Sequence, residues 1–222
     1  MNQIAFNSLA VVVFVITFSI LLGPFLQISP AIPAVVAFTI LSFLTLDTLG
    51  FQGRGLSLVL DWFAQKSPLH QARVLHHEAG HFLAAHLLGI PITGYTLSAW
   101  EALQQSQAGQ GGVAFDCREL TAGTASLQLL DRYCTVWMAG VVAETLVYGT
   151  FEGGADDRQK IKDIWTRLRQ NYQQKEHAAA LQARSLLKEH WNTYEALIKA
   201  MEQRASVVEC CQIIERSLSQ CD

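Results

Sequence analysis

The chain has 222 residues, half of them hydrophobic, and a formal net charge of −3. This length fits one domain of ordinary size with a small additional segment. The charge pattern shows no clustered basic face, so we expect no nucleic acid as a partner. Five cysteines without a C-x-x-C pair do not form the pattern of a disulfide framework, and we interpret them as free thiols in a reducing compartment.

The N-terminal part of the chain is free of charged side chains until Asp47. The apolar run 4–28 is long enough to cross a bilayer, and a second run, 31–46, follows a short loop that contains Pro30. We therefore predict a two-helix transmembrane hairpin over residues 1–50. Two alternatives are a cleaved signal peptide, which would need a positive n-region that is missing here, and two buried core helices.

The first basic residue, Arg54, follows the second apolar run, and the loop between the two runs has none. By the positive-inside rule, this asymmetry places the rest of the chain on the cytoplasmic, or equivalent stromal, side. A juxtamembrane linker is expected over residues 51–67. Within it, residues 53–55 would form a hinge, and residues 56–63 could lie along the membrane surface.

A helix that carries an H-E-x-x-H pattern is predicted next, starting at Pro68 and stopping at Gly89. His77 and His81 are four residues apart and therefore lie on one face, where both imidazoles can reach one zinc ion. Glu78 lies beside that face and is the candidate general base for a water that the metal activates. The pattern recurs by chance, so it needs further support. The remaining histidines are expected to be packed or solvent-facing: His70, His76, His86, His177 and His190.

A third zinc ligand must come from elsewhere in the fold, because catalytic zinc usually has three protein ligands and an open position. Residues 138–149 are predicted to end a helix at a glycine cap, Gly149. The Gly-rich turn that follows delivers Asp156 and Asp157 to the start of another helix. An aspartate there is more commonly an N-cap, so one of the pair could cap the helix while the other binds metal.

These segments together resemble the peptidase domain of the FtsH family of membrane-bound zinc proteases, roughly over residues 70–215. The resemblance rests on His77-Glu-Ala-Gly-His81, Leu87-Leu-Gly, Ala139-Gly140 through Ala143-Glu144 to Tyr148-Gly149, and Gly154-Ala-Asp-Asp157. In that family two histidines and the aspartate that closes the glycine turn hold the zinc ion. The resemblance therefore implies Asp157 as the third ligand, with Glu144 and Asp156 as supporting residues.

The chain departs from the family pattern in three respects. Val141 stands where the family usually has arginine, and Thr145 where it has a second glutamate. The substrate-side hairpin, expected over residues 92–97 and 111–115, has a longer connection that is rich in Gln and Gly. No G-x-x-x-x-G-K-[ST] phosphate loop occurs, so we expect this chain to bind no ATP.

The sequence thus predicts a mainly α fold, in which the hairpin and linker precede an FtsH-like helical zinc-peptidase domain at 68–222 with a small β-hairpin. The expected function is that of a membrane-anchored, ATP-independent zinc metalloendopeptidase that hydrolyses membrane-associated or unfolded proteins. Membrane lipid is an expected partner, as is a second copy or a membrane complex, in a thylakoid or plasma membrane. Substrate-binding residues are not assigned.

Two alternatives to this function remain at the level of the sequence. The departures at Val141 and Thr145 keep a non-proteolytic scaffold or assembly factor in consideration. An intramembrane protease of the site-two type would need the zinc helix inside the bilayer. Arg73 and the charged residues that follow it disfavour that placement.

Overall fold

The structure, a computed structural model, describes residues 13–14, 17–19, 21, 29, 31–50, 67–104 and 112–219. The chain divides into two compact units, residues 1–59 and 60–222. Several predicted features lie outside the described residues: most of the first apolar run, the hinge at 53–55, the segment 56–63, and Cys221. The four described cysteines are free thiols, as predicted.

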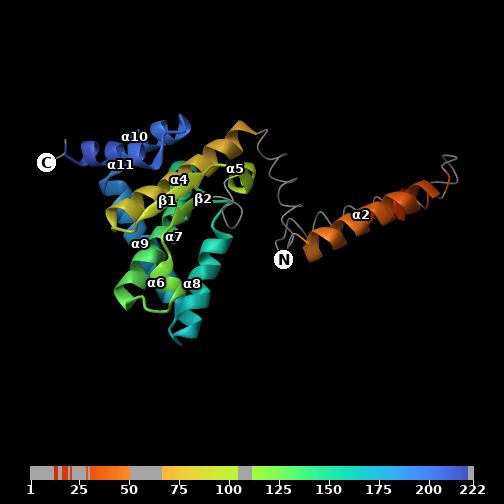
Figure 1. Cartoon of the computed structure of the whole chain (residues 1–222), viewed down its shortest axis with the longest axis horizontal. Coiled ribbons are helices and arrows are strands. Elements are labelled where there is room, and N and C mark those ends of the chain that lie inside the picture. Colours follow the sequence, from red (N-terminus) through yellow and green to blue (C-terminus); the bar gives the residue numbers. More distant parts are fainter. Residues whose placement is uncertain are drawn as a thin grey trace. The chain divides into compact units, whose positions relative to one another are not determined.

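The first unit contains the helix α2, Ala31–Gly50 (Figure 1). The prediction of two membrane spans is wrong, because none of the helices described by the structure is both long and apolar enough to cross a bilayer. Asp47 lies inside α2, so the uncharged part of this helix is shorter than the about 20 residues that a span requires. The predicted position on the cytoplasmic or stromal side of a plasma or thylakoid membrane depended on these two spans and is therefore not supported either.

The second unit is mainly helical with one small antiparallel sheet, as predicted. Its elements in chain order are α4 (Pro68–Leu87), β1 (Ile92–Thr96), α5 (Ala99–Gln104), β2 (Gly112–Phe115), α6 (Arg118–Thr121), α7 (Leu127–Tyr148), α8 (Ala155–Arg167), α9 (Tyr172–Glu189), α10 (Trp191–Glu202) and α11 (Val207–Leu218).

The predicted limits of α4 are confirmed. Pro68 occupies the first turn, where its missing N–H costs no helical hydrogen bond, and the chain leaves the helix at Gly89 with a positive φ of 68°. The helix α7 begins at the N-cap Ser126, whose side chain accepts a hydrogen bond from the N–H of Leu129. It ends at Gly149, with φ 75°, the glycine cap expected from the sequence.

The helices α4 and α7 form the centre of the second unit, with α9 packed on α7 and α10 packed on α4 (Figure 1). Their close approach depends on Gly80, because a Cβ at that position would lie 2.6 Å from the carbonyl oxygen of Ala139. Large side chains fill the surrounding core, among them Phe82, Trp165 and Tyr194, which are fully buried. Burial of such a side chain stabilises the fold by roughly 1.5–3 kcal/mol.

The hairpin of β1 and β2 lies beside α4, and its antiparallel pairing confirms the predicted β element. Tyr95 pairs with Val113, and its hydroxyl donates a hydrogen bond to the Ala205 carbonyl at 2.6 Å. This bond ties β1 to the segment between α10 and α11. The connection between the strands contains α5, and its second part, residues 105–111, lies outside the part that the structure describes.

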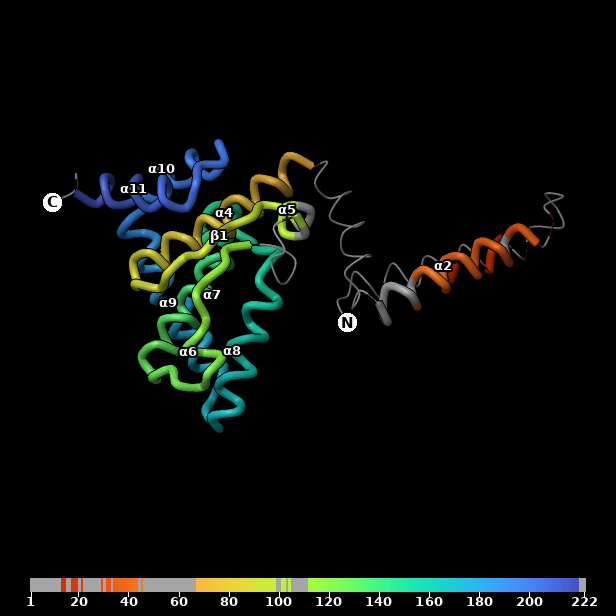
Figure 2. Tube along the Cα trace, viewed as in Figure 1, coloured from red at the N-terminus to blue at the C-terminus, as the bar shows by residue number. Residues whose placement is uncertain are grey.

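A tight turn joins α7 to α8 and reverses the direction of the chain (Figure 2). Both ends of the turn are glycines in the left-handed region, Gly149 with φ 75° and Gly154 with φ 83°. Gly154 also packs against Val141, whose Cγ2 would collide with any Cβ at position 154. The turn therefore brings the first residues of α8 back against α7 and α4.

Candidate metal centre

Two histidines project from successive turns of α4 toward α7. His77 and His81 are 8% and 5% exposed, and their rings meet edge to face with centroids 4.6 Å apart. The facing residue on α7 is Gly140, where a Cβ would lie 2.6 Å from the Nε2 atom of each histidine. The absence of a side chain at Gly140 therefore leaves the space that both Nε2 atoms face.

Each histidine is oriented by a hydrogen bond at its other ring nitrogen. The Nδ1 of His77 lies 2.7 Å from Glu144 Oε1, and the Nδ1 of His81 donates to the Val136 carbonyl oxygen, also at 2.7 Å. Since a carbonyl oxygen only accepts, neutral His81 carries its proton on Nδ1 and presents a lone pair at Nε2. Metal-binding histidines are typically held in this way.

The third member of the cluster is Asp157, in the first turn of α8 and 9% exposed. Its Oδ2 lies 3.6 Å from His77 Nε2 and 3.4 Å from His81 Nε2. Tetrahedral ligands bonded at 2.0–2.2 Å lie about 3.3–3.6 Å from one another, so these distances fit three ligands of one ion. His77, His81 and Asp157 thus form a buried group that could hold a metal ion.

The two carboxylate oxygens of Asp157 have separate partners. Oδ2 faces the histidines, whereas Oδ1 accepts a hydrogen bond from the Lys160 ammonium group at 2.9 Å. Asp156 is exposed and does not belong to the cluster. Neither aspartate caps α8, because the N-cap position is taken by Gly154. The alternative in which one aspartate is an N-cap is therefore not found.

Glu144, predicted as a supporting residue, lies one turn after Gly140 and is 2% exposed. Besides its contact with His77, its carboxylate accepts hydrogen bonds from the backbone N–H groups of Glu152 and Gly153, at 2.9 and 3.2 Å. Burial raises the pKa of Glu144, but the hydrogen bonds from His77 and these backbone groups outweigh it and lower the pKa. Glu144 therefore joins α4, α7 and the turn before Asp157 as an ionised carboxylate.

Without a metal ion the centre takes up a proton instead. Burial lowers the pKa of His77, but hydrogen bonds to Asp157 and Glu144 and the negative charge of Glu78 outweigh it and raise the pKa to about 10. Burial likewise raises the pKa of Asp157, yet its interactions with His81 and His77 and the positive charge of Lys160 outweigh burial and hold that pKa well below its usual range. The carboxylates of Glu78, Glu144 and Asp157 lie around the imidazoles of His77 and His81, and their negative charge favours a bound cation.

We expect metal binding to release about one proton from the protein at pH 7.5, because His77 must lose its proton to act as a ligand. Affinity for Co²⁺ should then rise roughly tenfold per pH unit up to about pH 10. Calorimetric titrations in two buffers of different ionisation enthalpy measure this release. Glu144→Gln lacks the carboxylate whose hydrogen bond helps to raise the His77 pKa, so the rise of affinity with pH should level off at a lower pH in this variant. A wild-type titration with no proton release would contradict the expectation.

Glu78, the predicted general base, lies between the histidines in sequence and points toward β2. Its Oε2 accepts a hydrogen bond from the N–H of Val113 at 2.9 Å, which fixes the carboxylate beside the metal group. Among the described residues no hydrogen bond to its Oε1 is found. The role of Glu78 in proton transfer stays a prediction.

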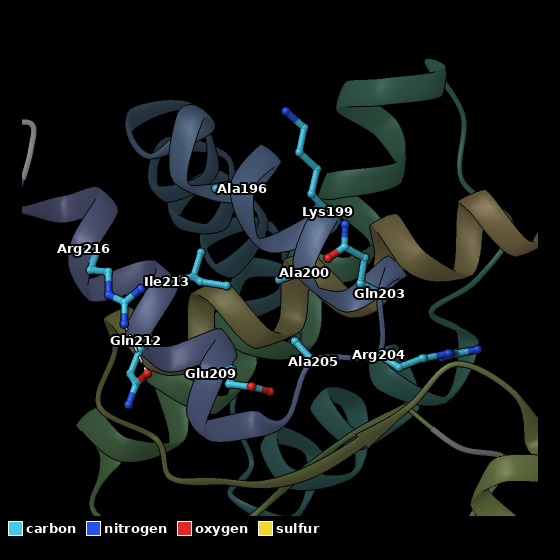
Figure 3. A pocket seen from close by; sticks show the side chains of 10 residues that line it. All are labelled: Ala196, Lys199, Ala200, Gln203, Arg204, Ala205, Glu209, Gln212, Ile213 and Arg216. Atoms are coloured by element: carbon cyan, nitrogen blue, oxygen red, sulfur yellow. Dashed lines mark hydrogen bonds between the residues drawn. The ribbon is translucent and has the colours of Figure 1, made fainter.

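A separate pocket of about 650 Å³ lies between α10 and α11, away from these residues in the fold (Figure 3). Its cationic side chains, Lys199, Arg204 and Arg216, point in different directions in Figure 3, and the two arginines contact other side chains. Arg204 pairs with Glu101 at 2.8 Å, and Arg216 contacts Gln212. Glu209 is engaged in the capping box of Ser206. The pocket therefore presents no convergent binding groups.

Some contributors to the centre were not found from the sequence. The Val136 carbonyl that orients His81 carries no sequence signal, because every residue has one. Lys160 follows Asp157 by three residues on the same helix, and Arg73 precedes His77 by four, so helical spacing could have indicated both. His76, expected to be a packed side chain, makes a hydrogen bond of 3.0 Å to the Tyr194 hydroxyl.

Comparison of the sequence with known protein families finds no matching family, and comparison with curated proteins finds no match either. The resemblance to the FtsH peptidase domain therefore stays a prediction that rests on the quoted motifs.

Proposed function

We propose that the protein is a zinc-dependent peptidase that hydrolyses unfolded polypeptides without ATP. The observation that carries the proposal is the convergence of two histidine Nε2 atoms and one aspartate oxygen beside a separate carboxylate, Glu78. Two nitrogen ligands and one oxygen ligand form a donor set that suits Zn²⁺ and leaves a fourth position open. The FtsH resemblance supports the same residue roles.

A zinc ion in this group would polarise the scissile carbonyl and make water more acidic. The residues of the chain supply the rest of the chemistry. Glu78 accepts the proton of the attacking water at Oε1, while Val113 holds Oε2 in place. The same carboxylate then donates that proton to the nitrogen of the leaving amine. Glu144 and Val136 keep the two histidine rings aligned throughout.

The expected substrates are extended chains, because nothing in the sequence couples ATP hydrolysis to unfolding. The assay is cleavage of an unfolded protein such as casein by the purified chain, with and without ATP, a chelator and added Zn²⁺. We expect cleavage that the chelator stops, Zn²⁺ restores and ATP leaves unchanged. A several-fold stimulation by ATP would contradict the proposal, and a folded, zinc-loaded chain without cleavage would favour the scaffold alternative.

A further inference from the structure

Arg73 lies one turn before His77 on α4 and is almost buried, with its side chain 12% exposed. Its guanidinium group pairs with the Glu144 carboxylate, Nη1 to Oε2, at 3.5 Å. It also contacts the carbonyl and hydroxyl oxygens of Thr150, both at 3.4 Å, and Glu152 Oε1 at 3.3 Å. The guanidinium carbon lies 4.5 Å from the centre of the Tyr148 ring, which completes its surroundings.

These contacts join the helix that carries both histidines to the end of α7 and to the turn before Asp157. Arg73 itself belongs to α4, which carries both histidines; Glu144 and Tyr148 belong to the end of α7; and Thr150 and Glu152 belong to the turn that leads to Asp157. Arginine suits such a position because its planar group offers several donors in fixed directions. A lysine would bring the same charge, but its ammonium group lacks the planar set of donors with which Arg73 contacts Glu144, Thr150 and Glu152.

The Glu144 carboxylate divides its two oxygens between different partners. Oε2 receives Arg73 and the N–H of Glu152, whereas Oε1 receives His77 Nδ1 and the N–H of Gly153. With Oε2 held in this way, Oε1 can only point at His77. The orientation of the His77 ring, and hence of its Nε2, therefore depends in part on the two groups that hold Oε2 of Glu144, Arg73 and the N–H of Glu152.

We propose that Arg73 is a positioning residue of the metal centre: it holds Glu144 and the 150–152 turn so that His77 and Asp157 meet at one point. This inference rests on the metal group of the proposed function but not on hydrolysis. Its readout is therefore metal affinity, which a failure of the peptidase activity would leave unchanged. Partners that orient metal ligands typically change affinity about 10–100-fold when they are removed.

The test is Co²⁺ titration of folded Arg73→Met, followed by the visible absorption of the bound ion. We expect Co²⁺ affinity to fall about 10–100-fold. Arg73→Lys, which restores the charge but not the planar group, should bind more weakly than wild type and more tightly than the methionine variant. The matched control is Lys175→Met, since Lys175 also lies over a ring, that of Trp165, and pairs with a carboxylate, that of Asp131, but contacts neither Glu144 nor the 150–152 turn. That control should stay within about twofold of wild type.

A double variant separates positioning from a general effect on stability. If Arg73 acts largely through Glu144, adding Arg73→Met to Glu144→Gln should cost clearly less affinity than Arg73→Met costs in wild type, because only the contacts with Thr150 and Glu152 remain to be lost. Multiplying losses would contradict the proposal, as would wild-type Co²⁺ affinity in either Arg73 variant. If the methionine variant does not fold, the lysine variant decides by the same criterion. A wild type that binds no metal would instead overturn the proposed function itself.

Discussion

Glu78→Gln should lose hydrolysis of an unfolded substrate by about 10²–10⁴-fold while the protein keeps its fold and its metal ion. The amide oxygen of glutamine can still accept the hydrogen bond from Val113 N–H, so the side chain should stay beside β2. It cannot accept a proton from water, however, and that is the step assigned to Glu78. Cleavage rate and Co²⁺ affinity, measured on the same preparation, separate these two properties.

The control for this variant is Glu119→Gln, which removes an exposed carboxylate from α6 and should leave the rate unchanged. Two results would contradict the assignment. Near wild-type cleavage by Glu78→Gln would show that another group accepts the proton. A loss of metal together with activity would show that Glu78 contributes to the metal group instead of acting as the base.

Asp157→Asn should lower Co²⁺ affinity by at least about 100-fold. Removing a residue that only orients a metal ligand lowers affinity by about 10–100-fold, and loss of a ligand itself should cost at least as much. Asp157 Oδ2 lies within 3.6 Å of both histidine Nε2 atoms, so the variant replaces an anionic donor with a neutral amide. The measurement is a Co²⁺ titration at constant pH. Thermal unfolding without metal should confirm that the variant is folded.

Asp156→Asn is the matched control, because it removes the same charge from the same helical turn at an exposed position. It should keep most of the wild-type affinity. Loss of affinity in Asp156→Asn, but not in Asp157→Asn, would place the third ligand one residue earlier. If neither variant changed affinity, the third ligand would lie elsewhere, and Glu144 would be the next candidate because it already contacts His77.

Local patterns predicted the part of the centre that lies within one helix. The capping signals of α4 and the four-residue spacing of His77 and His81 depend on neighbouring residues, and both are found in the structure. The partnership of Asp157 with them required the family resemblance, because 76 positions separate Asp157 from His81 in the chain (157 − 81). The conformation of the turn between Gly149 and Gly154 decides that Asp157, and not Asp156, faces the histidines. The residue types alone did not determine that conformation.

Two features of the structure were not predicted from the sequence. The uncharged run at the N-terminus predicted two membrane spans, but none of the described helices has the length and apolarity of a span, and α2 includes Asp47. The role inferred for Arg73 depends on five contacts that link α4 to the end of α7 and to the turn after it, 71 or more residues later in the chain. No single stretch of the sequence contains that set.

The most direct test of the account is the zinc content of the wild-type chain, purified under reducing conditions because its described cysteines are free thiols. The measurement is elemental analysis by mass spectrometry, run beside Asp157→Asn after the same exposure to Zn²⁺ and the same dialysis. The account predicts about one zinc ion per wild-type chain and a small fraction of that in the variant. A folded wild type that retains no more zinc than Asp157→Asn would contradict it.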